Sequence, residues 1–278
     1  MIPASFDYIR AESPSEALAL LGEYGDDAKI LAGGHSLIPL MKLRLASPSV
    51  LIDVAKVREL SYIRDEGDHI AVGALTRHCE VERSELLQAA VPLVAHVAGV
   101  VGDPQVRHRG TIGGSIAHGD PASDLPAAVL ALGATMVVSG PAGTREVPAQ
   151  EFFRDFLETA IAPDELLTEI RLPKSDGAGW SYQKFNLRAQ DWAIVGVAAV
   201  GARAGGGISL VNMASTPIRA SSVEQAVAAG TSASEAARLA SEGLTPPSDL
   251  NASAAYRRHL ASVLVRRALE EVDARNGS

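Results

Sequence analysis

The sequence predicts an α+β protein made of two domains. In the first part of the chain, segments with the apolar spacing of helices occur together with antiparallel hairpins. A polar, glycine-rich stretch at residues 174–179 is then typical of a linker. Beyond it, three strand-like segments are followed by three helical patterns. With 278 residues, 47% of them hydrophobic, the chain is long enough to form two cores.

The N-terminal elements surround a glycine pair. Ser13-Pro14-Ser15-Glu16 is a capping-box pattern with proline at the first helical position, so a helix is expected to begin there. A short apolar strand at residues 29–32 runs directly into Gly33-Gly34-His35-Ser36. Residues 37–44 then have a helical pattern, and residues 50–54 form a buried strand.

The rest of the first domain alternates helices with hairpins. In chain order we expect a hairpin at 62–72, an apolar helical stretch at 86–101 that Asp103-Pro104 interrupts, a second glycine turn at 109–115, a helix at 123–132, a hairpin at 135–148 and a strand at 165–172.

After the linker, the strand-like segments at 180–185, 193–202 and 208–213 predict an antiparallel sheet with a tight turn at Gly205-Gly206-Gly207. Helical patterns follow around Val223, at 234–242 and at 256–273. The last mixes arginine with apolar residues, so we expect one face packed on the core and a solvated basic face.

Composition excludes several classes of function. The formal net charge of −8 and the lack of any basic block argue against binding to nucleic acid. Cys79 is the only cysteine, so neither an intrachain disulfide nor a self-contained iron–sulfur cluster can form, and we expect it to be a small semi-buried apolar residue. Because no run of about 18 uncharged apolar residues occurs, a soluble, cytoplasmic protein is expected.

The two glycine pairs, Gly33-Gly34 and Gly113-Gly114, share a physical property. Without a Cβ, their backbone can adopt unusual dihedral angles and let a ligand approach the N–H groups closely. Consecutive N–H groups can bind a pyrophosphate, although ordinary tight turns explain the same spacing equally well.

Other site motifs fit less well. The G-x-G-x-x-G fingerprint and any Gly-Lys pair are missing from the sequence. Gly34-His35-Ser36-Leu37-Ile38 begins like a hydrolase nucleophile elbow, but Ile38 stands where glycine is needed. His118, Asp120 and Asp124 suit a metal by residue type but not by spacing. Asp124 is better explained as a helix cap, as an acceptor for ligand hydroxyls, or as both.

Residues 29–39 and 110–115 together resemble the two flavin loops of the FAD-binding subunits of the molybdenum hydroxylase family. The likeness extends over Met1-Ile2-Pro3, 103–107 and 119–124, and is strongest to the carbon monoxide-oxidising members. It implies a two-subdomain FAD-binding fold of the vanillyl-alcohol oxidase (PCMH) type over residues 1–175, with subdomains of about 1–55 and 56–175. A C-terminal flavoprotein domain with a three-stranded antiparallel sheet would cover 176–278.

The resemblance implies a set of FAD-contacting positions and no catalytic residue, since the chemistry occurs at the flavin ring. The expected positions are Ile30, Leu31, Ala32, Gly33, Gly34, His35, Ser36, Leu37, Val101, Thr111, Ile112, Gly113, Gly114, Ser115, Asp124, Leu166, Leu167, Lys184 and Trp192. Lys184 would stabilise the anionic reduced flavin. Trp192 either lies against the flavin or is a core tryptophan. Ser115 stands where relatives often have asparagine, so a side-chain contact would be lost while the backbone contacts of Gly113 and Gly114 persist.

The same resemblance implies partners. Substrate would be oxidised at a molybdopterin centre on a large subunit, and two [2Fe–2S] clusters on a small subunit would pass electrons to FAD. A dimer of heterotrimers (a heterohexamer) is expected, with quinone favoured over NAD as acceptor and any membrane contact peripheral, at the inner face. Carbon monoxide is the expected substrate, with xanthine, aldehydes and N-heterocycles as alternatives. A standalone flavoenzyme of the same fold is the alternative function.

Overall fold

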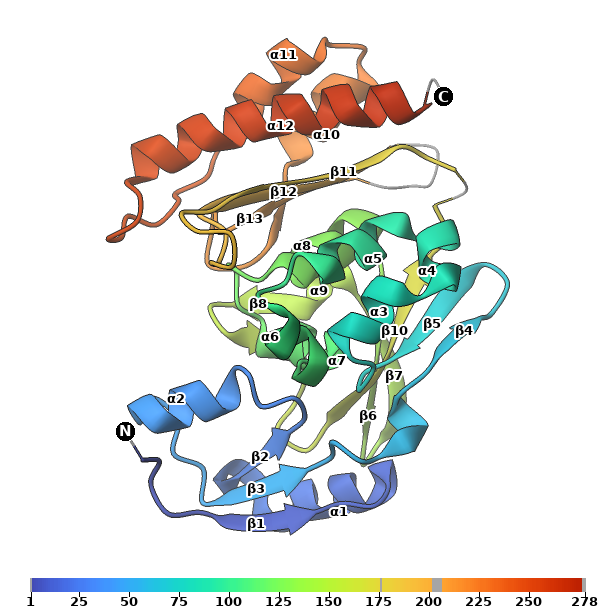
Figure 1. The fold of residues 1–278 in the computed structure, drawn as a ribbon, viewed down its shortest axis with the longest axis vertical. Helices are drawn as coiled ribbons and strands as arrows, with labels where there is room; N and C mark the ends of the chain where they lie inside the picture. Colours follow the sequence, from blue (N-terminus) through green and yellow to red (C-terminus); the bar gives the residue numbers. More distant parts are fainter. Residues whose placement is uncertain (1, 176, 202–206, 277–278) are drawn as a thin grey trace.

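The computed structural model describes residues 2–175, 177–201 and 207–276 (Figure 1). Its helices are α1 Pro14–Tyr24, α2 Leu37–Leu43, α3 His78–Arg83, α4 Glu85–Ala90, α5 Pro92–Gly99, α6 Pro104–Arg109, α7 Ile112–His118, α8 Asp124–Leu132, α9 Ala149–Phe152, α10 Ser221–Ala228, α11 Ala233–Ala236 and α12 Ala254–Asn276. Its strands are β1 Asp7–Arg10, β2 Ala28–Leu31, β3 Val50–Asp53, β4 Ile63–Asp65, β5 His69–Gly73, β6 Thr135–Gly140, β7 Gly143–Pro148, β8 Phe153–Asp155, β9 Glu158–Thr159, β10 Leu166–Pro173, β11 Trp180–Phe185, β12 Val195–Val200, β13 Ile208–Val211 and β14 Ile218–Arg219.

The N-terminal unit is a parallel sheet of order β1-β3-β2 that α1 covers. Ser13 caps α1 by accepting a hydrogen bond from the Glu16 N–H at 3.1 Å, as the capping pattern predicts. Leu21 of α1 packs on Ile52 of β3 in a small core. Strand β1 was not predicted, because most of its side chains are exposed and give no apolar signal.

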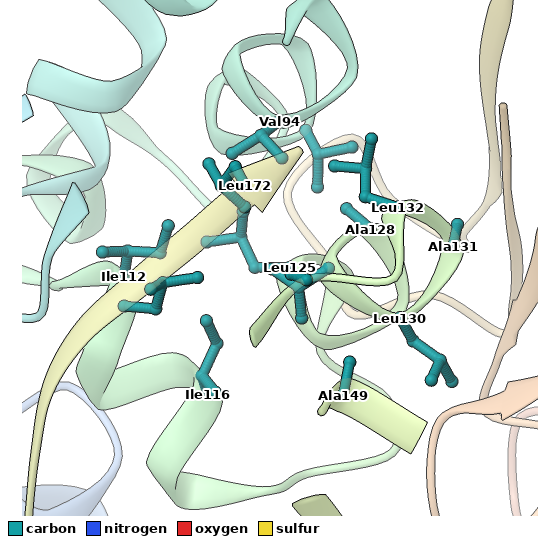
Figure 2. Packing of buried hydrophobic residues seen from close by; sticks show 14 of the residues in the cluster. Val94, Ile112, Ile116, Leu125, Ala128, Leu130, Ala131, Leu132, Ala149 and Leu172 are labelled. Carbon is teal, nitrogen blue, oxygen red and sulfur yellow. The ribbon is translucent and has the colours of Figure 1, made fainter. Parts of the chain in front are cut away.

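The central sheet is antiparallel, with order β4-β5-β10-β6-β7. Helix α8 is buried along its whole length because it lies between this sheet and the C-terminal one (Figure 1). Figure 2 shows Leu125 of α8 beside Leu172 of β10, with Val94 of α5 and Ile112 of α7 nearby. This core holds α7 and α8 in fixed positions.

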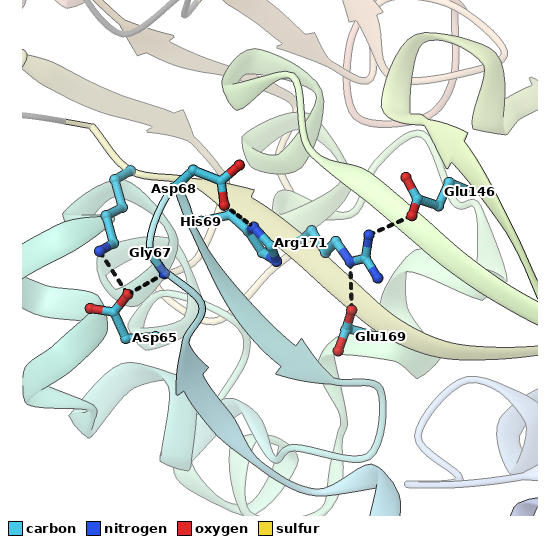
Figure 3. A network of polar contacts seen from close by, with 8 residues as sticks. Asp65, Gly67, Asp68, His69, Glu146, Glu169 and Arg171 are labelled. Atoms are coloured by element: carbon cyan, nitrogen blue, oxygen red, sulfur yellow. Dashed lines mark hydrogen bonds and ion pairs between the residues drawn. The ribbon is translucent and has the colours of Figure 1, made fainter.

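Charged side chains lie on the central sheet (Figure 3). Arg171 on β10 binds Glu169 of the same strand at 2.7 Å and Glu146 of β7, two strands away, at 2.5 Å. Near the β4–β5 turn, Lys174 binds Asp65 at 2.7 Å. These ion pairs are partly solvent-exposed, so they order the sheet surface and contribute little stability.

The C-terminal sheet has four strands, β11-β12-β13-β14, where three were predicted. The short β14 gives no sequence signal because it is only two residues long. Both faces of β12 are buried: Ala198 and Val200 face α8, whereas Val197 and Ala199 face the core beneath α12. Residues 205 and 206 of the expected glycine turn lie outside the described residues.

Several predictions of local structure were wrong. The stretch 86–101 forms two helices, because Pro92 begins a new one at α5. The second glycine pair lies inside α7 and not in a turn, because Thr111 caps that helix. Arg257 of α12 is not on a solvated face: it is 1% exposed and donates hydrogen bonds to the Ile194 carbonyl and to Asp249.

Among the residues that the structure describes, no helix is both long enough and apolar enough to cross a membrane.

Candidate functional site

A cavity of about 620 Å³ opens where the N-terminal unit, α7 and the C-terminal sheet meet. This volume is in the range of cofactor sites. Every predicted cofactor position except Leu31 and Ile112 lines it. Ile112 is wholly buried in the main core, and the Leu31 side chain packs beneath Gly34.

The lining residues come from elements that are far apart in the sequence. The end of β2 and the following loop into α2 provide Ile30, Ala32, Gly33, Gly34, His35, Ser36 and Leu37; the segment after α5 provides Val101; α7 and its cap provide Thr111, Gly113, Gly114 and Ser115; and Asp124, Leu166, Leu167, Lys184 and Trp192 come from α8, β10, β11 and the β11–β12 loop.

The first glycine loop presents backbone donors to the cavity. Within the described part of the chain, the N–H groups of residues 33–37 donate no hydrogen bond. Gly34 has φ of 78°, a left-handed conformation that favours glycine. Gly33 needs to be glycine for a different reason, since a Cβ there would lie 2.8 Å from Gly110 Cα and against the Arg109 carbonyl. This loop therefore has the geometry of an anion-binding turn.

The second glycine pair does not repeat this arrangement. The Gly113 N–H donates to the Ala74 carbonyl at 2.9 Å, and the Gly114 N–H donates to the Thr111 hydroxyl at 3.1 Å. A Cβ on Gly113 would overlap the Ala74 backbone. Both donors are used within the protein, so the expected cradle of N–H groups at this pair does not form. Both glycines still line the cavity, and neither places a side chain in it.

Asp124 connects α8 to β11 at the cavity wall. Its carboxylate accepts hydrogen bonds from the Tyr182 hydroxyl at 2.5 Å and from the Lys184 ammonium at 2.8 Å. It does not cap α8, because Ser123 occupies the N-cap position. Burial raises the pKa of Asp124, and the Lys184 charge opposes this rise. Asp124 therefore binds two side chains of β11 and still lines the cavity, and its predicted contact with the cofactor stays a prediction.

Lys184 keeps one donor for a ligand. Its ammonium binds Asp124 and, at 3.2 Å, the Val100 carbonyl. An ammonium has three N–H donors, so the third can face the cavity that Lys184 lines.

Tyr182, which binds Asp124, was not predicted from the sequence. The available signal was the strand period of two, which places residues 182 and 184 on the same face of β11.

Two further side chains define the cavity. Trp192 is 57% exposed, so it is not a core tryptophan. His78, which was not predicted from the sequence, lines the cavity although only 4% of it is exposed, and burial lowers its pKa to about 4.

The side chains of His118 and Asp120 do not join Asp124 in a cluster. Over the described ranges, no group of three or more His, Cys, Asp or Glu residues could hold a metal ion.

Two family models match this chain. Residues 4–175 match the FAD binding domain in molybdopterin dehydrogenase, and residues 180–272 match the CO dehydrogenase flavoprotein C-terminal domain. The chain therefore belongs to the family of FAD-binding subunits of molybdenum hydroxylases, and it is an oxidoreductase subunit.

Within that family, the chain is similar to the carbon monoxide dehydrogenase medium chain of Hydrogenophaga pseudoflava, with 42% identity over 99% of both chains. It is 38% identical to the glyceraldehyde dehydrogenase medium chain of Sulfolobus acidocaldarius over 98% of this chain and 100% of the other. A solved structure of the H. pseudoflava carbon monoxide dehydrogenase, which lacks the Mo-pyranopterin moiety, matches 99% of both chains with a TM-score of 0.94 and 43% identity.

The cavity fits the cofactor of this family. The N–H groups of residues 33–37, which have no acceptor within the described ranges, suit the negative oxygens of a diphosphate. At the other side, Leu166 and Leu167 give an apolar wall and Lys184 a positive charge, which suit a flavin ring.

Proposed function

We propose that this chain binds one FAD noncovalently across the junction of its two domains. The observation that carries the proposal is a single cavity with backbone donors on the first loop and Lys184 on β11. Residues 1–175 would hold the cofactor, and residues 176–278 would complete its site through Lys184 and Trp192. Bound FAD supplies reversible two-electron chemistry at its ring.

In this proposal the residues of the chain orient the ring and adjust its charge. Asp124 is the counter-charge of Lys184, while the third N–H of Lys184 would donate to an electronegative ring atom. The apolar side chains of Leu166 and Leu167 exclude water from the ring. Trp192, exposed at the cavity wall, lies where a partner or an electron acceptor can approach.

The chain would act as an electron relay and not as the site of substrate oxidation. Cys79 is its only cysteine, so [2Fe–2S] clusters must be held by another subunit. We propose a small iron–sulfur subunit and a large molybdenum subunit as partners, in a dimer of heterotrimers. Electrons would leave through FAD to an external acceptor, with quinone favoured over NAD, in the cytoplasm or at the inner face of the membrane.

Carbon monoxide is the proposed substrate of the whole complex, supported by the similarity to carbon monoxide dehydrogenase medium chains. Glyceraldehyde dehydrogenase is the function named for a relative of comparable coverage, so aldehydes are the first alternative. Xanthine and N-heterocycles are further alternatives. The substrate pocket would lie on the large subunit, and this cavity does not select among them.

The relay is tested by anaerobic reduction followed at the flavin absorbance band. The isolated yellow chain is mixed with carbon monoxide, glyceraldehyde or xanthine, and the measurement is repeated after the two partner subunits are added. We expect bleaching only in the presence of the partners and only with one substrate. Bleaching of the isolated chain would show a standalone flavoenzyme. A colourless chain that takes up no added FAD would contradict the cofactor assignment itself.

Noncovalent attachment has its own readout. Denaturation should release the flavin into the supernatant, and the released compound should be FAD. Flavin that stays with the precipitated chain, or release of FMN, would contradict this part of the proposal.

A further inference from the structure

We propose that His78 is an FAD-binding residue whose Nε2–H donates a hydrogen bond to a diphosphate oxygen of the cofactor. This inference rests on the proposed FAD site and adds a contact that neither glycine loop provides. It is carried by the burial of the imidazole, by the environment of its two nitrogens and by its position beside the first loop.

The two ring nitrogens of His78 have different surroundings. Nδ1 is fully buried and has no hydrogen-bond partner among the described residues. Nε2 also makes no hydrogen bond with the described chain, but it is not among the fully buried unpartnered atoms. Because His78 lines the cavity, Nε2 is the atom that reaches the cavity surface.

This asymmetry selects one protonation state. The ring is neutral near pH 7, because burial and the neighbouring charges of His35, Arg77 and Arg107 lower its pKa to about 4. A neutral imidazole carries one proton, and an N–H buried without an acceptor is costly. The proton is therefore favoured on Nε2, where a ligand can accept it. His78 acts as a donor toward the cavity without adding a full charge to it.

The position of the ring identifies the part of the ligand. A Cβ on Gly110 would lie 2.7 Å from the His78 ring, and a Cβ on Gly33 would lie 2.8 Å from Gly110 Cα. His78 and Gly33 thus flank the same glycine on the cavity wall. The unpartnered N–H groups of residues 33–37 belong to this end of the cavity. An acceptor that serves both the loop and His78 is a diphosphate oxygen.

The test compares three ligands on the full chain stripped of flavin. FAD carries both the flavin ring and the diphosphate, ADP carries the diphosphate without the flavin, and riboflavin carries the flavin without the diphosphate. His78→Phe keeps a planar ring but removes the donor, whereas His78→Gln restores an N–H donor at a similar distance. His96→Phe is the matched control, because His96 lies in a separate cavity beside Trp180. Dissociation constants are measured by fluorescence titration or calorimetry, and folding is checked by circular dichroism.

We expect His78→Phe to bind FAD and ADP about 10- to 100-fold more weakly, the range of one hydrogen bond to a charged group. Riboflavin affinity should not change, His78→Gln should recover most of the loss, and His96→Phe should behave as wild type. Equal weakening for FAD and riboflavin, or no change for FAD, would overturn the proposal. If His78→Phe does not fold, the folded His78→Gln variant decides the question. This variant should bind ADP nearly as well as wild type, and a clear loss of ADP affinity would overturn the proposal. Wild-type chain that binds no FAD would instead refute the proposed function.

Discussion

Replacing Asp124 should show that it acts as a clamp between α8 and β11. In the native chain its carboxylate accepts hydrogen bonds from Tyr182 at 2.5 Å and Lys184 at 2.8 Å, and the side chains of Asp124 and Lys184 are 8% and 11% exposed. Asp124→Ala leaves a buried ammonium without its counter-charge and a buried hydroxyl without its acceptor. Removing one partner of a buried ion pair costs about 3–5 kcal/mol, so we expect a loss of this size.

The double variant gives the sharper test. In Asp124→Ala/Lys184→Met neither charge remains, so the double variant should be more stable than Asp124→Ala alone, with a coupling energy of about 1–3 kcal/mol. Tyr182→Phe is the matched control, because it removes one hydrogen bond to the carboxylate and keeps the ion pair, and it should cost about 1.5–3 kcal/mol. Urea unfolding at pH 7, followed by circular dichroism, is measured for five flavin-free chains: wild type, Asp124→Ala, Lys184→Met, the double variant and Tyr182→Phe. Strict additivity of Asp124→Ala and Lys184→Met in the double variant would refute the clamp.

Three further predictions concern the cavity wall. Gly33→Ala should lose both stability and flavin affinity, because its Cβ would meet the Arg109 backbone. The Cβ of Gly114→Ala would meet only the Thr111 hydroxyl, so this variant should cost about 1 kcal/mol. Thermal melts with and without FAD compare the two variants, and equal effects would contradict the packing argument. The pKa of His78 is lowered from 6.5 to about 4, so between these values the unfolded chain binds a proton that the folded chain does not. Stability should therefore fall by up to about 3 kcal/mol as the pH falls through this window, and the fall should be smaller in His78→Gln when urea unfolding is repeated across pH. Trp192→Ala should change the free energy of unfolding by no more than about 0.5 kcal/mol, because the side chain is mostly exposed; a loss of several kcal/mol in the same assay would show that it belongs to the core.

Local sequence patterns determined much of the fold. The capping pattern at Ser13 marks the start of α1, because its hydroxyl accepts a backbone N–H. The period of two along β11 is typical of a strand, and the continuous apolar runs of β3 and β12 indicate strands that are buried on both faces. The family resemblance predicted which residues face the cofactor. All of the predicted positions except Leu31 and Ile112 line the cavity. Strands with exposed side chains, such as β1, gave no such signal.

The roles of individual residues at the site were decided by the tertiary structure. Sequence alone could not show that the Gly113 N–H is taken by the Ala74 carbonyl, because that bond joins segments 39 positions apart. Nor could it show that Asp124 accepts hydrogen bonds from Tyr182 and Lys184, which lie 58 and 60 positions further along the chain. His78 has no local pattern at all. The sequence of a segment encodes its hydrophobic period and its turns. The hydrogen bonds and pKa values of a site depend instead on which distant segments pack against the site and exclude water from it.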